Sequence, residues 1–322
     1  MKISNLAISS ALALGLGAGM VTNATADVHA VAVNEITNLT VVFTNPTQPD
    51  SAVFRVDRNA DLGSIPGTDG GNVPFNSGTA PFDVTQAFQG SGAAPAENTF
   101  SAVGDLGYNY ARSDSSILQS QLNPGQPPVP SGSTSTSSSS VAESYLSSND
   151  NGFGDAGNSS ITTVTFTSDG TQSISFRFDS DPYLLARVDA DSAFASDASA
   201  EISLVFVISN AAGDPIFEWA PDGTIGDITG GTESLDPFAL NDLITRDQDN
   251  TGVAITDNTN GTFAAVTNVL DADTYTLELR LRTTVNTQLT RADNPEPEML
   301  GLLGLSMLGI GFARFLRRRK AA

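Results

Sequence analysis

The chain has no cysteine, one histidine and one tryptophan among its 322 residues. The absence of cysteine excludes disulfides, thiol nucleophiles and zinc or iron–sulfur centres held by thiolates. Because His29 is the only histidine, a metal site built from several histidines is excluded and a Ser-His-Asp triad has only one possible base. We therefore predict a protein that is not an enzyme.

Basic residues are also scarce, with 15 Lys and Arg against 36 Asp and Glu and a net charge of −21. Six of the 15 lie near the two ends of the chain, so residues 27–294 contain 34 acidic residues and nine arginines, a net charge of 9 − 34 = −25, and no lysine. Such a surface repels phosphate backbones, which argues against nucleic acid as a partner. Dense acid without lysine is typical of a hydrated, exported domain.

The N-terminus has the features of a secretory signal peptide over residues 1–26. Lys2 precedes the apolar stretch Leu6–Val21, and Ala24-Thr25-Ala26 supplies the small residues that signal peptidase requires, with Ala24 and Ala26 at the two recognised positions. A first transmembrane helix is the alternative, but the apolar stretch is short and rich in glycine. The mature chain then begins at Asp27, and we expect His29 to lie in a mobile, non-catalytic terminus.

The C-terminus combines three features in a fixed order. Pro295-Glu296-Pro297 precedes the apolar stretch Met299–Ala313, and Arg317-Arg318-Arg319-Lys320 follows it. The apolar stretch, extended to Leu316, reaches the shortest length that spans a membrane. The basic cluster stays in the cytoplasm by the positive-inside rule, so the sequence predicts a single transmembrane helix that holds the acidic body outside.

This order resembles the PEP-CTERM sorting signal of Gram-negative bacteria, over residues 294–322. The resemblance implies recognition by exosortase, a membrane transpeptidase that cleaves near Pro295-Glu296-Pro297. It also implies transient anchoring in the inner membrane, followed by delivery to the cell surface or to the exopolysaccharide matrix of a biofilm. An ordinary C-terminal anchor is the alternative.

Between the two ends, alternation of apolar and polar residues predicts β-strands. Ile174, Phe176 and Phe178 alternate with polar residues, as do the leucines of 275–282, and 202–208 is apolar on both faces, as in a central strand. Turn residues separate these segments. We predict an all-β fold, an antiparallel β-sandwich or jelly-roll-like body built chiefly from 160–291 and completed by strands near Leu39 and Val53, with one short helix over Ser113–Leu122.

Composition divides the chain further. Residues 27–122 form an N-terminal β-rich region, 123–142 a Pro/Ser-rich linker or long loop, and 143–293 the β-sandwich domain. Whether the two β-rich regions form one domain or two stays open. Asp50-Ser51-Ala52, together with Phe217–Gly223 and Asp236–Asn241, is similar to a PEP-CTERM subgroup with an EDSA-type motif, although Pro49 stands in the place of its glutamate. That resemblance implies no chemistry.

Two acidic segments are candidate calcium loops. Asp57, Asn59 and Asp61 have the 1, 3, 5 spacing of a calcium-binding loop, and Asp247 and Asp249 form the second candidate. Gly63 and Thr68 depart from the pattern of such a loop. The alternative is that these aspartates serve turns and solubility.

Other candidate sites are weaker. Glu218 beside Trp219 is the acid best placed for a hydrolase, and exposed Trp219, Tyr183, Tyr108 and Tyr110 could stack on sugars. The sequence favours a non-enzymatic, exported protein with a structural or adhesive role. A calcium-stabilised or carbohydrate-binding extracellular module is the alternative.

Overall fold

A computed structural model describes residues 27–44, 51–62, 73–75, 82–118, 136–147, 152–189 and 196–290. The chain divides into two units, Met1–Thr290 and Arg291–Ala322, and every described residue belongs to the first, which we call the body. All regular elements of the described residues are β-strands, and none of them is a helix. No helix that could span a membrane occurs in these segments.

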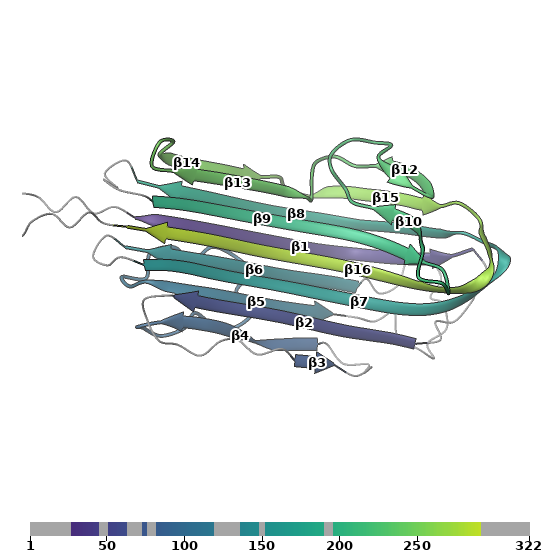
Figure 1. Ribbon diagram of the computed structural model, residues 1–322, viewed down its shortest axis with the longest axis horizontal. Coiled ribbons are helices and arrows are strands. Elements are labelled where there is room, and N and C mark those ends of the chain that lie inside the picture. Colours follow the sequence, from purple (N-terminus) through teal and green to yellow (C-terminus); the bar gives the residue numbers. More distant parts are fainter. Residues whose placement is uncertain are drawn as a thin grey trace, which may run out of the picture. The chain divides into compact units, whose positions relative to one another are not determined.

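The strands form two eight-stranded sheets in which every pair is antiparallel (Figure 1). Sheet A has the order β12 (Gly231–Leu235), β15 (Gly261–Thr267), β8 (Ile174–Val188), β1 (Val28–Phe43), β6 (Thr136–Leu146), β5 (Tyr110–Leu118) and β4 (Phe82–Gly90), and β14 (Gly252–Asp257) also pairs with β8. Sheet B has the order β11 (Ile228–Thr229), β10 (Pro215–Trp219), β9 (Ser196–Ser209), β16 (Leu270–Leu289), β7 (Gly152–Gln172), β2 (Ser51–Leu62) and β3 (Val73–Phe75), and β13 (Asp242–Asp247) also pairs with β9.

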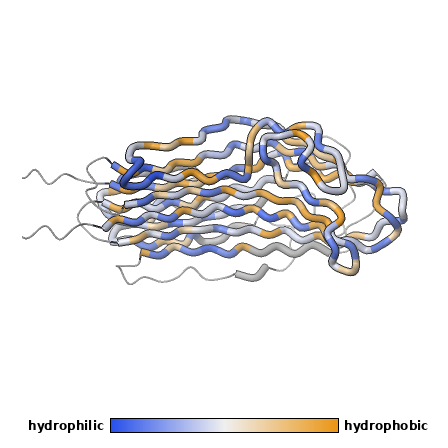
Figure 2. Tube along the Cα trace, turned by 45° about the horizontal axis from the view of Figure 1, so that its top comes forward, coloured by the Kyte–Doolittle hydropathy of each residue, from blue (hydrophilic) through white to orange (hydrophobic). Residues whose placement is uncertain are grey.

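The two sheets pack face to face, and the alternation along each strand decides which side chains lie between them (Figure 2). In β9 every second residue from Ser196 to Ile208 is buried, and its neighbours are half-buried on the other face. The same period of two runs through β8 and β16. The result is consistent with the predicted β-sandwich.

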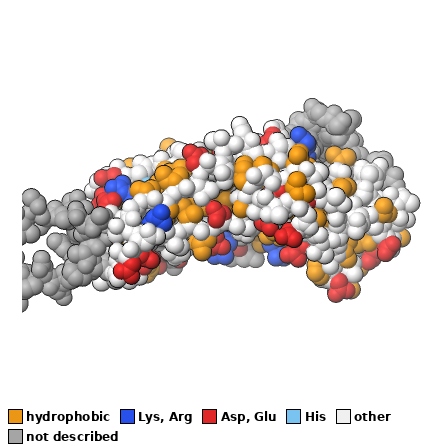
Figure 3. Space-filling view, turned by 90° about the horizontal axis from the view of Figure 1, so that it is seen from above, with side chains coloured by type: hydrophobic (Ala, Val, Ile, Leu, Met, Phe, Trp, Pro, Cys, Tyr) orange, Lys and Arg blue, Asp and Glu red, His pale blue; other side chains and the backbone are white. Residues whose placement is uncertain are grey.

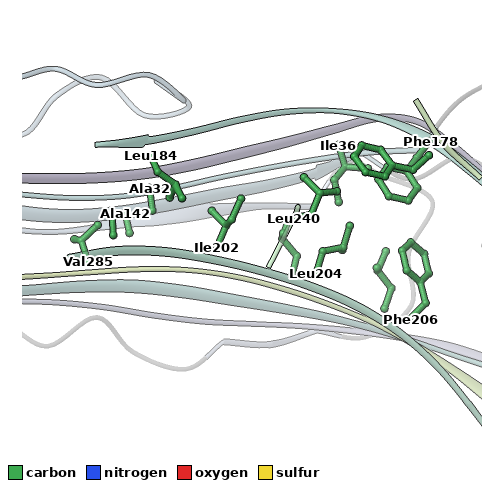
Figure 4. Packing of buried hydrophobic residues seen from close by; sticks show 14 of the residues in the cluster. Ala32, Ile36, Ala142, Phe178, Leu184, Ile202, Leu204, Phe206, Leu240 and Val285 are labelled. Carbon is green, nitrogen blue, oxygen red and sulfur yellow. The ribbon is translucent and has the colours of Figure 1, made fainter. Parts of the chain in front are cut away.

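Aromatic and aliphatic side chains from both sheets fill the interior (Figure 4). Phe178 of sheet A stacks on Phe263 at a ring-centroid distance of 4.9 Å and on Phe206 of sheet B at 5.5 Å. Trp219 joins them at 5.0 Å from Phe206 and is 1% exposed. Burial of each such ring contributes about 1.5–3 kcal/mol, so this cluster is a main source of stability.

Most of the predicted strands are confirmed, but the helix expected over Ser113–Leu122 is wrong. Residues 110–118 form β5, which pairs with β4 on one side and with β6 on the other. Ser113 and Ser115 are fully buried, and the Ser113 hydroxyl donates to the backbone carbonyl of Asn59 in sheet B at 2.9 Å. Pairing on both edges outweighs the weak helix propensity of this Ser- and Asp-containing segment.

The linker predicted over 123–142 also ends earlier than expected. Strand β6 begins at Thr136 and lies between β1 and β5, with Ser138 and Ser140 buried. Small serine side chains fit a strand that has a neighbour on each side. Backbone hydrogen bonds to β1 and β5 hold this strand in the sheet, and burial of large apolar side chains is not needed. Both predicted β-rich regions contribute strands to both sheets, so the body is one unit.

The two ends of the body lie at the same end of the sheets. Val28, at the start of β1, pairs with Val188 at the end of β8. Leu289, at the end of β16, pairs with Ser196 at the start of β9, the next strand after β8. The loops on both sides of β10, after Ser209 and after Trp219, lie at the opposite end of β9.

Candidate functional site

The outer face of sheet B carries rows of polar side chains across β2, β7 and β16. In one row Asn59 pairs with Gly157, which pairs with Thr284; in the next, Asp57 pairs with Ser159, which pairs with Arg282. These residues alternate with the core-facing residues of the same strands, so their side chains point away from the interior. Three segments that are far apart in the sequence thus form one polar surface.

A pocket lies in the middle of this surface. Its volume is about 360 Å³, and the residues that line it are Asp57, Arg58, Asn59, Gly157, Asn158, Ser159, Arg282 and Thr284. A Cβ atom added at Gly157 would lie 2.7 Å from the Asn59 side-chain oxygen and 3.1 Å from the Thr284 methyl group. The missing side chain of Gly157 therefore lets the Asn59 and Thr284 side chains approach each other over this strand. We call the pocket that these residues line the Gly157 pocket.

Asp155 and Asp61 form a pair of carboxylates in the outer-face row next to that of Asn59 and Gly157. They are register partners on β7 and β2, and side chains directly opposite each other in such a pair have Cβ atoms about 5 Å apart. Burial and the charge of Asp61 raise the pKa of the Asp155 carboxyl, while a hydrogen bond from Asn59 and the charge of Arg282 act in the opposite direction. The surface around the pocket therefore contains both signs of charge.

The loop predicted around Asp57, Asn59 and Asp61 is a strand as far as Leu62. Alternate side chains of a strand point to one face but start about 6.6 Å apart, so these three do not converge as they would in a calcium loop. Asp57 and Asn59 instead line the Gly157 pocket. No group of three or more acidic or histidine side chains is placed to hold a metal ion within the described residues.

Asp247 and Asp249 belong to the turn between β13 and β14. The Asp247 carboxylate accepts hydrogen bonds from the backbone N–H groups of Asp249 and Asn250 at 2.9 and 2.8 Å. This is the arrangement by which aspartate stabilises a turn, the alternative that the sequence left open. Burial and the nearby charge of Asp247 raise the pKa of Asp197, its register partner on β9.

On the outer face of sheet A, by contrast, the structure shows a buried ionic cluster that the sequence did not indicate. Glu143 accepts hydrogen bonds from Arg112 Nε at 2.8 Å and from the backbone N–H groups of Val103 and Gly104 at 3.1 and 3.0 Å. His29 Nε2 lies 2.9 Å from the same carboxylate. The side chains of Arg112 and Glu143 have no exposed surface, so this is a fully buried ion pair.

Residues 91–109, which we call the covering segment, enclose this cluster. The Arg112 guanidinium also donates to the backbone carbonyls of Thr99 and Ser101 at 3.0 and 2.5 Å. Phe100 packs on a small apolar cluster of Val31, Val33 and Val141 on the same face. The expected mobile terminus at His29 is therefore wrong, because this residue is 6% exposed within a central strand.

Burial alone would raise the pKa of Glu143, but the hydrogen bond with His29 and the charge of Arg112 lower it below its ordinary value. Tyr110 lies beside this carboxylate, and its pKa is raised by burial and by the charge of Glu143. Its hydroxyl donates to the Gly104 carbonyl at 2.8 Å. The hydrogen bonds of Glu143, Arg112 and Tyr110 to the backbone of residues 99–104 thus hold the covering segment in place.

The structure does not place the candidate hydrolase residue or the candidate sugar-stacking residues as the sequence predicts. Trp219 is buried and its indole N–H donates to Glu233 at 2.5 Å, while Glu218, the next residue back, is exposed on the other face of β10. Trp219 therefore does not desolvate Glu218. Tyr110 is fully buried, and Tyr108 and Tyr183 are half-buried, so none of the four aromatic residues is an exposed platform.

The segments 217–223 and 236–241, which the sequence groups by their resemblance to one subgroup, lie against each other. The Asp236 carboxylate accepts hydrogen bonds from the backbone N–H groups of Asp222, Gly223 and Thr224 at 3.0, 2.8 and 3.2 Å. Gly223 has φ of +85° and lies against the backbone of Phe238 and Ala239, which a side chain would disturb. Both segments therefore contribute to one loop structure.

The remaining predicted sites lie outside the described residues. They are the signal peptide with Ala24 and Ala26, the sorting motif Pro295, Glu296 and Pro297, the predicted helix after it, and the basic cluster Arg317, Arg318, Arg319 and Lys320. Residues 123–135 of the predicted linker also lie outside.

No family model matches the chain, and neither a curated protein nor a solved structure matches it.

Proposed function

We propose that the chain is a non-enzymatic exported protein that exosortase sorts to the surface or exopolysaccharide matrix of a Gram-negative bacterium, where it has a structural or adhesive role. Signal peptidase removes residues 1–26, and the apolar stretch after Pro297 holds the protein in the inner membrane until exosortase acts near Pro295-Glu296-Pro297. The basic cluster at 317–320 keeps the extreme C-terminus inside.

One observation carries this proposal: the strands of the body fill the interval between the two predicted processing sites. Strand β1 begins at Val28, one residue after the expected new N-terminus, and the Asp27 carbonyl accepts a hydrogen bond from the Asp189 N–H at 3.0 Å. Strand β16 ends at Leu289, before the segment that contains the sorting motif. Cleavage at both predicted sites would leave the two sheets intact.

The position of the ends supports the same function. β1 starts and β16 ends at one end of the sheets, so attachment through the C-terminus leaves the loops around β10, at the opposite end of β9, outside the point of attachment. Acidic side chains are distributed over the face of the body that is seen in the view onto the β13–β14 side (Figure 3). A hydrated acidic surface suits a matrix environment.

The strand order also bears on the class of fold. Because β8-β1-β6-β5 of sheet A faces β9-β16-β7-β2 of sheet B, we class the sandwich as jelly-roll-like.

The tail is tested with a matched pair of substitutions in cells that contain exosortase. Glu296→Gln changes the motif, whereas Glu298→Gln removes the same charge at the position directly after the motif. We expect only the first to block processing, and deletion of Arg317–Lys320 to impair retention and sorting. Mass spectrometry of the surface-bound and released protein should give a mature C-terminus near Pro297. Unchanged processing and delivery of both the Glu296→Gln variant and the deletion would refute the proposal.

Calcium stabilisation stays a prediction, which the Asp61–Asp155 pair favours because two adjacent carboxylates attract a hard cation. Calcium that binds the folded body should raise its melting temperature by mass action. Asp61→Asn should abolish this rise, while Asp249→Asn in the β13–β14 turn should leave it. An equal response of both variants and the natural chain would place any calcium elsewhere.

A further inference from the structure

The Gly157 pocket combines hydrogen-bond donors and acceptors of both charges within one small space. Asp57 supplies acceptor oxygens, Arg282 supplies donors, and Asn59 supplies both. A simple anion would be repelled by Asp57, and a simple cation by Arg282. A neutral molecule with adjacent hydroxyl groups avoids both penalties, because each hydroxyl donates to a carboxylate and accepts from a guanidinium or amide.

The size of the pocket limits the ligand to about one ring. Pockets for small ligands occupy about 300–1,000 Å³, and this pocket, at about 360 Å³, lies near the lower limit. Asn59 and Arg282, on its two sides, are exposed. A bound ring would therefore keep one side in solvent, which suits a single unit within a longer chain.

A second feature on the same face also fits a carbohydrate. Phe153 lies on β7, four residues before Gly157, and the alternation of the strand places both on the outer face of sheet B. Its side chain is 47% exposed, unlike the phenylalanines of the core. The apolar face of a sugar ring packs well on an exposed aromatic ring, and the spacing along β7 is about 13 Å.

We propose that the outer face of sheet B binds a neutral polysaccharide along β7, with one sugar unit in the Gly157 pocket and another against Phe153. This inference deepens the proposed matrix function and rests on it, since it names the class of ligand that an adhesive body would hold. The contacts are to sugar hydroxyls and need no metal ion. A single unit in such an open polar pocket binds with a Kd on the order of 1 mM, and several units on one polymer add avidity.

The test measures retardation of the purified full chain, kept in detergent, in gels that contain neutral glucans, mannans or galactans, with polygalacturonate as the acidic comparison. Gly157→Val adds a branched side chain to the pocket, where its Cβ meets the flexible side chain of Asn59 first and the Thr284 methyl group next. We expect Gly157→Val and Arg282→Gln each to weaken binding at least about tenfold, and Phe153→Ala about three- to tenfold.

Matched controls lie on the same sheet. Arg280→Gln removes a guanidinium two residues from Arg282 on β16, where Arg280 pairs with Glu278, and Leu243→Ala removes an exposed apolar side chain from β13. Both should bind as the natural chain does. Circular dichroism of each variant confirms folding, and Arg282→Gln keeps the test decisive where Gly157→Val unfolds.

Four results would overturn the inference: retention by none of the neutral polymers, retention by polygalacturonate alone, loss of retention when a chelator is added, or full retention by both Gly157→Val and Arg282→Gln. Sorting is scored separately through Glu296→Gln, whose position is outside the pocket. Failure of sorting with intact binding therefore counts against the proposed function, and failure of binding with intact sorting counts against the pocket alone.

Discussion

The outer faces of the two sheets use the same kinds of side chain in opposite ways. On sheet A, Arg112 and Glu143 are completely enclosed by the covering segment, with each charge satisfied by hydrogen bonds. On sheet B, Arg280 and Glu278 form a comparable pair on β16, but their side chains are 55% and 30% exposed. An ion pair in water contributes little to stability, whereas a buried one is costly to break. The first face is therefore structural, and the second is available for binding.

The largest expected effect comes from breaking the buried pair. Glu143→Gln leaves the Arg112 guanidinium buried without its counter-charge, which should lower the free energy of unfolding by about 3–5 kcal/mol. Glu278→Gln, the matched change on sheet B, should cost less than about 0.5 kcal/mol. Urea unfolding of the two variants measures the difference. Equal costs would show that the two faces do not differ as described.

A smaller loss of stability is expected when the covering segment is loosened. Phe100→Ala removes the apolar contact with Val31, Val33 and Val141 and, because Phe100 is only half-buried, should cost about 1–2 kcal/mol. Hydrogen exchange at Val103 and Gly104 should become roughly tenfold faster or more, since these N–H groups are protected only while the cover is closed. Phe153→Ala on the open face of sheet B serves as control and should leave that exchange unchanged.

The two faces should also differ in their response to acid. The folded-state pKa of Glu143 is lowered from its ordinary value of 4.5, so its contribution is fully present above that pH and is lost as the pH falls through the folded value. Stability of the natural chain should thus decrease below about pH 4.5, and Glu143→Gln should flatten part of this slope. The Glu278→Gln variant should lose stability below about pH 4.5 as the natural chain does. If this variant flattens the pH dependence of stability as much as Glu143→Gln, Glu143 is not the source of that dependence.

The smallest effect should have the opposite sign. The pKa of Asp155 is raised by burial and by Asp61, so its ionised form costs stability at neutral pH and this cost disappears as the pH falls through the raised value. Asp155→Asn should therefore stabilise the body at pH 7, by no more than about 0.5 kcal/mol because solvent screens the pair. Thermal melts at pH 7 and pH 3.5 test this: a gain that persists at the lower pH would point to another cause.

Strands with a strong period of two were predictable from the sequence, and those without it were not. Segments such as 174–178 and 202–208 place an apolar residue at every second position, so the buried face is visible in the sequence. Strands β5 and β6 contain mostly Ser, Ala and Asp where they lie side by side, and only their pairing with neighbours makes them strands. A helix and a linker were predicted there because propensity was the only available signal.

The candidate site was predictable only in part. Asp57 and Asn59 belong to one of the two predicted calcium loops, and they do line the pocket, but from a strand. Their partners Gly157 and Arg282 lie about 100 and 225 positions further along the chain, and no local pattern links the three segments. The buried cluster of His29, Arg112 and Glu143 is equally absent from the sequence pattern, because His29 contacts Glu143, which lies 114 residues further along the chain.

The sequence by itself determined the composition-based features. These are an acidic body without cysteine or lysine, mainly β in character, between two ends that contain the predicted signal peptide and sorting signal. These properties depend on residue type and local order alone. Only the tertiary structure decided which charges are buried and which remain in water, where Gly157 leaves a pocket, and that both ends of the body lie together. Those properties depend on which strands pair and on what lies over each face, and such contacts join residues that are distant in the chain.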